Sequence, residues 1–170
     1  MKNGTKLAVA AFALIAFSSS SFAQATATAT ATATIVTPIS IAEVVNMNFG
    51  NVAVQTATGG TVVMTPAGVR SATGGVTLPA INGTVTAASF TVTGNGTYTY
   101  AITLPAAALT LTSGANTMTA DTWTSTPTAT GILTAGTQTL NVGATLNVAA
   151  AQAAGVYVSG TPFNVTVNYN

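Results

Sequence analysis

The sequence predicts an all-β fold, built as an antiparallel β-sandwich. Apolar and polar residues alternate in several segments, which is the pattern of strands that bury one face. Glycine-containing turns separate short runs of valine, threonine and leucine, and many short strands at this spacing are typical of a sandwich or barrel. Helical patterns are nearly absent, and the alanine-rich stretch at 149–154 is expected to be a connector.

Residues 1–23 have the order of a secretory signal peptide. Two lysines precede an apolar run from Leu7 to Phe17, and the small residues Ser21 and Ala23 follow it. The run has 11 residues, whereas a membrane-spanning helix needs about 20. We therefore expect cleavage after Ala23, or after Ala25 as a second option. The sequence predicts an exported protein located in the periplasm, at the cell surface or outside the cell.

Cleavage after Ala23 leaves 147 of the 170 residues, enough for one domain with a core. We expect residues 24–34 to form an alanine–threonine extension and residues 35–170 to form a single β-sandwich domain. This part has one positive charge, Arg70, and two negative charges, Glu43 and Asp121. Binding to nucleic acid or anionic lipid is therefore not expected, and neither is a membrane span. The chain has no cysteine, so core packing and sheet hydrogen bonds must stabilise the fold.

The clearest strand signal is at the C-terminus. One face carries Phe163, Val165, Val167 and Tyr169, and the opposite face carries threonine and asparagine. We expect these four side chains to line the core from a C-terminal strand.

A second pair of alternating segments, 90–92 and 98–104, flanks the sequence Gly94-Asn95-Gly96. Asparagine next to glycine favours backbone with positive φ, as in tight hairpin turns. The sequence therefore predicts a β-hairpin over residues 90–104.

The alternation at residues 25–34 has two interpretations. It is a low-complexity linker at a chain end, followed by the first strand of the domain from Ile35 onward. Alternatively, the segment that includes Ile35, Ile39 and Ile41 is an assembly strand that one copy donates to another. The spacing of these isoleucines on one face suits both interpretations.

The side chains needed for most enzyme chemistry are missing. Without histidine or cysteine, histidine-ligated metal sites, thiol catalysis and a serine–histidine pair are excluded. Glu43 and Asp121 are two carboxylates of the kind that a glycosidase uses as an acid–base pair, but they are 78 residues apart in the sequence, and surface or turn roles are the simpler interpretation. We expect no enzyme activity, metal or cofactor. Arg70 is expected to bond loop carbonyls, with a ligand-binding role as the alternative, and Trp123 to pack in the core or on a sheet face.

Five segments of the chain resemble a known family of secreted bacterial proteins. They are Asn48-Phe49-Gly50-Asn51-Val52, residues 66–75 with central Arg70, residues 89–94, residues 136–143 and residues 163–169. They are similar to the domain of unknown function 4402. The resemblance implies an exported β-fold and no established activity.

A looser similarity is to subunits of chaperone–usher fimbriae. Those subunits end in an alternating strand with a penultimate aromatic residue, matched here by Tyr169, and carry an N-terminal extension of alternating apolar residues. Two features differ, because those subunits often have a glycine where this chain has Tyr157, and many have a disulfide. The resemblance implies an immunoglobulin-like or pilin-like sandwich.

Together these observations predict a non-enzymatic structural or adhesive protein, secreted or on the cell surface. Its expected partners are copies of itself or other surface proteins, and a fimbrial-like subunit that assembles by strand donation is one form of this. The alternative is a monomeric secreted binding module for a carbohydrate or a surface protein. The near absence of surface charge leaves little to oppose self-association, so the protein either assembles or is kept soluble by the side chains of threonine and asparagine.

Overall fold

The computed structural model describes residues 24–170; the predicted signal peptide, residues 1–23, lies outside the described part. Residues 24–34 are exposed and contain no strand or helix. Residues 35–170 form one compact unit, separate from the unit that includes residues 24–34. Between residues 24 and 170 there is no helix, and hence none that could cross a membrane.

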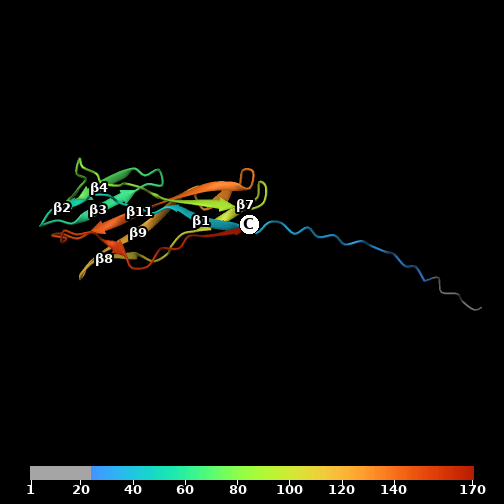
Figure 1. Cartoon of the computed structure of the whole chain (residues 1–170). Coiled ribbons are helices and arrows are strands. Elements are labelled where there is room, and N and C mark those ends of the chain that lie inside the picture. Colours follow the sequence, from blue (N-terminus) through green and yellow to red (C-terminus); the bar gives the residue numbers. More distant parts are fainter. Residues whose placement is uncertain (1–23) are drawn as a thin grey trace, which may run out of the picture. The chain divides into compact units, whose positions relative to one another are not determined.

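Three antiparallel sheets make up the compact unit, which is drawn in Figure 1. The eight-stranded sheet contains β1 (Ser40–Val45), β6 (Ala88–Thr93), β11 (Thr137–Val148), β9 (Asn116–Thr126), β8 (Leu109–Ser113) and β12 (Val158–Ser159), with β3 (Gly60–Met64) and β4 (Arg70–Gly74) branching from β11. The others contain β10 (Thr130–Ile132), β7 (Thr99–Thr103) and β13 (Thr166–Tyr169), and β2 (Ala53–Val54) with β5 (Val76–Thr77). The predicted all-β, antiparallel, sandwich-like fold is confirmed.

Strand β11 connects the two halves of the large sheet. Its first half pairs with β6 and its second half with β3, while β9 lies along its other side. The change of partner occurs at Gly143, where an added Cβ would lie 2.1 Å from the carbonyl oxygen of Met64. Only glycine leaves room for this close approach of two backbones.

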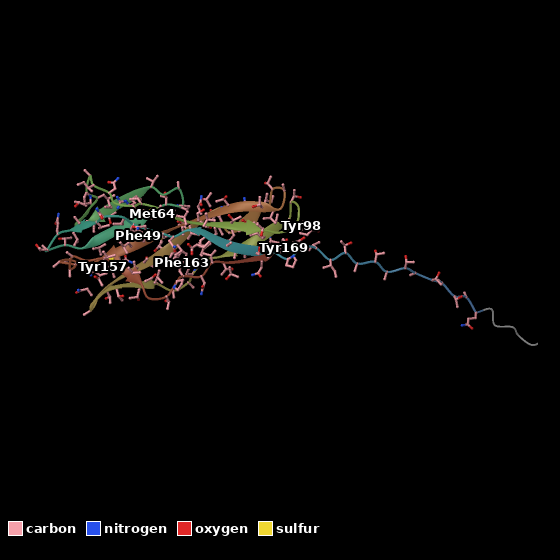
Figure 2. All side chains as sticks on the ribbon, viewed as in Figure 1. Phe49, Met64, Tyr98, Tyr157, Phe163 and Tyr169 are labelled. Carbon is pink, nitrogen blue, oxygen red and sulfur yellow. The ribbon has the colours of Figure 1, made fainter. Side chains whose placement is uncertain are left out.

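Two hydrophobic clusters lie on the inner face of β11. One cluster is built around Val62, Met64 and Leu146, and the other around Tyr100, Leu133 and Leu140. Even-numbered residues of β11 enter both clusters, as the two-residue period of a strand requires. Figure 2 shows Phe49 and Met64 in one half, and Tyr98 and Tyr169 at the other end.

The outer face of the large sheet carries rows of hydroxyl and amide side chains. One row crosses five strands through Thr73, Thr61, Asn147, Thr119 and Thr110. The hydroxyls of Thr61 and Thr73 are 2.7 Å apart, and Asn147 Nδ2 donates to Thr119 Oγ1 over 3.3 Å. These cross-strand bonds stabilise the sheet and keep its outer face polar with little charge.

The predicted hairpin over residues 90–104 is wrong. Strand β6 pairs with β1 and β11, whereas β7 pairs with β10 and β13 in another sheet. The loop between them crosses from one sheet to the other, and Gly94 N–H donates to the carbonyl of Gly136 over 2.9 Å. Val92 and Tyr100 are both fully buried, in one cluster. The alternation correctly indicates two strands that each bury one face. These strands belong to different sheets, and their buried faces meet across the core.

The first strand begins at Ser40, five residues later than predicted. Ile35 is 97% exposed, whereas Ile39 and Ile41 pack against the second cluster. The chain is held just before the strand, because Tyr169 Oη donates to the carbonyl oxygen of Thr37 over 2.9 Å. The three isoleucines therefore divide into one exposed residue and two that stabilise their own domain.

At the C-terminus, strand β13 contains Val167 and Tyr169, and residues 163–165 precede it. Val167 is buried, and Phe163, Val165 and Tyr169 are half-buried against the same cluster. Their polar neighbours at even-numbered positions are exposed. Alternation thus continues beyond the hydrogen-bonded strand into the segment that leads to it.

Candidate assembly site: an apolar groove beside an open strand edge

The first cluster is not fully covered, and a groove of about 1090 Å³ opens onto it. Its floor consists of inward-facing side chains from β6, β8, β9 and β11, among them Leu109, Leu111, Met118, Leu146 and Val148. Leu109, Leu111 and Met118 are only half-buried, so the groove exposes apolar surface that a closed sandwich would cover.

Two segments that are distant in the sequence border this groove. One is residues 43–54, which includes the end of β1 and Phe49; the other is residues 152–163, which includes Tyr157 and β12. Strand β12 has two residues and pairs with no described strand other than β8. Val156 and Val158 on this border are 80% and 59% exposed. The groove therefore has an apolar rim as well as an apolar floor.

Strand β1 lies at the end of the eight-stranded sheet, and among the described strands it pairs with β6 alone. An edge strand presents unpaired N–H and C=O groups along its free side. Glu43 and Val45, near the end of this strand, also line the groove. The free backbone edge and the exposed apolar floor are therefore adjacent.

A β-bulge directs the tryptophan into the groove. Thr122 has a φ of 50°, and β9 has one residue more than β11 at this point. Before the bulge Met118 and Ala120 face the core; after it Trp123 faces inward, against both clusters. The Trp123 ring lies 4.5 Å from that of Phe163 between centroids, and Phe163 meets Phe90 edge to face at 6.3 Å.

Arg70 holds one border of the groove in place. Its Nη1 donates to the carbonyl oxygen of Phe49, and to that of Asn51 over 3.1 Å. Arg70 therefore bonds loop carbonyls, as the structural interpretation of the sequence expects. Because these carbonyls belong to the segment 43–54, the guanidinium fixes the position of the border that lies beside Phe49.

The two carboxylates are on opposite faces of the large sheet. Glu43 is opposite Phe90 in the β1–β6 pairing and lines the groove. Asp121 is on the outer face, where it accepts hydrogen bonds from Asn147 Nδ2 over 2.9 Å and from Thr122 Oγ1 over 2.9 Å. They do not converge on one site as a glycosidase pair would, and Glu43 is the one charged residue among those lining the groove.

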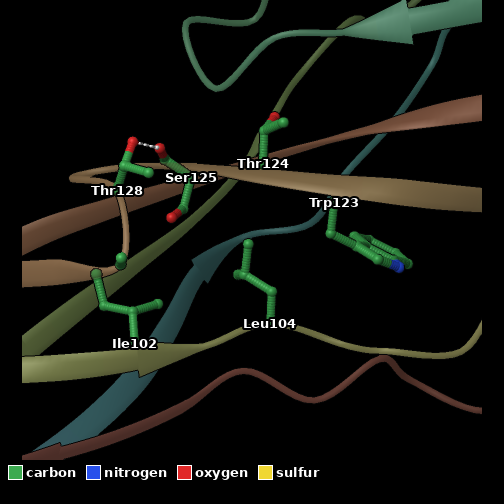
Figure 3. A pocket seen from close by; sticks show the side chains of 7 residues that line it. Ile102, Leu104, Trp123, Thr124, Ser125 and Thr128 are labelled. Atoms are coloured by element: carbon green, nitrogen blue, oxygen red, sulfur yellow. Dashed lines mark hydrogen bonds between the residues drawn. The ribbon is translucent and has the colours of Figure 1, made fainter.

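A smaller hollow of about 370 Å³ lies on another side of Trp123, next to Ile102 and Leu104 (Figure 3). Two of the hydroxyls that line it, those of Ser125 and Thr128, bond within the protein. Ser125 Oγ donates to the carbonyl of Pro127 over 2.8 Å, and Thr128 Oγ1 donates to the carbonyl of Ser125 over 2.9 Å. These hydroxyls stabilise a turn, and we assign no function to this hollow.

Sequence reasoning named Ile35, Ile39 and Ile41 as an assembly strand, but it missed the groove. Of the three, Ile35 alone is free of the core. In the sequence, the side chains that line the groove have the pattern of ordinary core residues on separate strands. The sequence offers one indirect signal, the two valines at 156 and 158 that follow the alanine-rich connector, and the structure shows that both are exposed.

Comparison with known proteins identifies the family. The family model described as domain of unknown function (DUF4402) matches residues 39–169. No curated protein and no solved structure matches the chain. The matched range contains every strand of the described residues, and it leaves out residues 24–38 and the final residue, Asn170. The chain belongs to the DUF4402 family, the domain of unknown function that its sequence segments resemble.

Proposed function

We propose that this chain is an exported, non-enzymatic structural protein of the cell surface, whose copies associate by adding a strand at the open edge of β1. The observation that carries the proposal is the position of this edge directly beside an apolar groove. A strand added there gains main-chain hydrogen bonds and also covers apolar side chains. Each large apolar side chain that becomes fully buried contributes roughly 1.5–3 kcal/mol.

The composition supports a structural role without catalysis. Residues 24–170 contain one positive and two negative side chains, with no histidine or cysteine. The two carboxylates are on opposite faces of the sheet, so they supply no acid–base pair. A surface covered by threonine hydroxyls and carrying little charge also gives weak electrostatic repulsion between copies.

The second candidate function is a monomeric binding module for a carbohydrate or a surface protein. The aromatic rings of Phe90, Trp123 and Phe163 around the groove favour it, because such rings offer flat apolar surfaces to a ligand. A monomer that binds a ligand through these rings would need no second copy. The oligomeric state therefore separates the two candidates.

Light scattering and electron microscopy of the protein purified after export test the proposal. We expect oligomers or filaments that persist on dilution. Val45→Lys places a charge at the groove and should reduce association. Val69→Lys, at an exposed valine of the turn before β4 and away from the groove, should leave it unchanged. A protein that is monomeric at all concentrations would refute assembly and favour the binding module.

A further inference from the structure

We propose that residues 25–35 of one copy occupy the groove of a second copy and lie along the free edge of its β1. The inference rests on the proposed function and specifies both partners of the contact. Odd-numbered side chains, the alanines at 25–33 and Ile35, face the floor of the groove. The threonines at even positions face solvent, as threonine does on the outer face of the large sheet.

The donor segment suits a strand site. Residues 24–34 form no strand or helix of their own and are exposed throughout. At about 3.3 Å per residue, an 11-residue segment extends over roughly 36 Å, whereas the six residues from Glu43 to Asn48 need about 20 Å. The segment is therefore long enough to follow the whole bordering edge.

The donor segment also matches the groove in charge and in the size of its side chains. Residues 24–42 carry no charged side chain, so none would be buried without a partner against the apolar floor. Ile35 is the single large apolar side chain on the donor's inward face, and it is almost fully exposed in its own copy. We assign it as the anchor of the contact, with the small alanines allowing close approach to the partially covered floor.

The occupant is a second copy because the chain cannot easily turn back on itself. To follow the free edge of its own β1, the segment would have to reverse direction between Ile35 and Ser40. Thr37 is bound by Tyr169 Oη, and Ile39 is packed against the core. Pro38 restricts the residue before it to extended backbone, which opposes a turn at this place.

Energy transfer from Trp123, the only tryptophan, tests the assignment. One copy carries Trp123→Phe and a dansyl fluorophore on Thr32→Cys, an outward position in a chain that has no other cysteine. It is mixed with unlabelled protein that retains Trp123. We expect transfer in the mixed oligomers, and its loss with Ala33→Asp in the labelled copy but not with Thr34→Asp. Ile35→Ala should weaken association at least about tenfold.

The outcomes separate this inference from the proposed function. Transfer that occurs only when label and tryptophan are on the same chain would show that the segment fills its own groove, and would overturn the inference. Oligomers without transfer would place the contact elsewhere, although self-assembly would stand. If Ala33→Asp and Thr34→Asp act equally, the assigned inward face is wrong. Fluorescence of Trp123 in unlabelled variants verifies that each is folded.

Discussion

The phenol of Tyr169 donates a hydrogen bond to the carbonyl oxygen of Thr37 over 2.9 Å, and it accepts one from Asn95 N–H over 2.6 Å. One side chain of the last strand thus fixes both the entry to the first strand and the loop between the two sheets. In the proposed assembly, this contact marks the end of the donated segment and the start of the folded domain.

Loss of the Tyr169 hydroxyl should therefore destabilise the domain. Tyr169→Phe removes both bonds and leaves the Asn95 N–H without this acceptor, so we expect a loss of about 1–3 kcal/mol in the free energy of unfolding. Chemical denaturation measures it. Tyr98→Phe is the matched control, since Tyr98 packs on Tyr169 edge to face but is half-exposed. An equal loss in both variants would contradict the role of the hydroxyl.

Phe163 and Asn164 are adjacent but differ in environment. Phe163 packs between Phe90 and Trp123, while Asn164 is exposed. Because Phe163 is only half-buried, Phe163→Ala should cost close to the lower end of the roughly 3–5 kcal/mol found for core aromatic residues. Asn164→Ala should cost less than about 0.5 kcal/mol. Similar melting temperatures of the two variants would show that the inward face is misassigned.

Tyr100 predicts a loss of stability at alkaline pH. Burial raises the pKa of its phenol above the ordinary value of about 10. The unfolded chain therefore releases this proton first, and stability that is complete below pH 10 falls as pH rises through the folded-state pKa. Denaturation at pH 8 and at pH 11 measures the slope. Tyr100→Phe should flatten it, and an unchanged slope would assign the effect to other tyrosines.

Substitution by alanine should change the stability of the domain in opposite ways at Gly143 and at Gly160. A Cβ on Gly143 would lie 2.1 Å from backbone of the neighbouring strand, where β11 changes partner, so Gly143→Ala should destabilise the domain by several kcal/mol. A Cβ on Gly160 meets nothing within 4 Å. Gly160→Ala should be neutral or stabilise by up to about 1 kcal/mol, because it restricts the unfolded chain. Thermal melts of both variants measure the difference, and equal melting temperatures would contradict the prediction.

Export predicts a shortened chain. Mass spectrometry of protein from the periplasm or medium should show a new N-terminus at Gln24 or Thr26. An intact N-terminal methionine in the exported fraction would remove the basis for a surface location, and would place charged lysines ahead of the proposed donor segment.

Local patterns in the sequence were enough to predict strands and their faces. At residues 163–169, where the sequence shows the clearest alternation, inward and outward residues alternate in the structure. The pairing of the strands on either side of Gly94–Gly96 could not be predicted, because this turn sequence is compatible both with a hairpin and with a crossing between sheets. The groove could not be predicted either. Residues 43–54 and 152–163 are distant in the sequence, and the order of the strands between them is what brings both segments to one groove. The bulge at Thr122 reverses the alternation of β9 without any distinctive residue.

The shared strand β11 has a consequence for how the domain opens. Its inward side chains enter both hydrophobic clusters, and it has three partner strands. Neither half can therefore detach without exposing the strand that the other half needs. In hydrogen–deuterium exchange of the monomer, before any strand is added, amides of β11 should exchange last, in a single global event, while the short border strand β12 and the free side of β1 exchange through local fluctuations. The border of the groove can therefore move locally, so that a donated segment can enter or leave, while the rest of the protein stays folded.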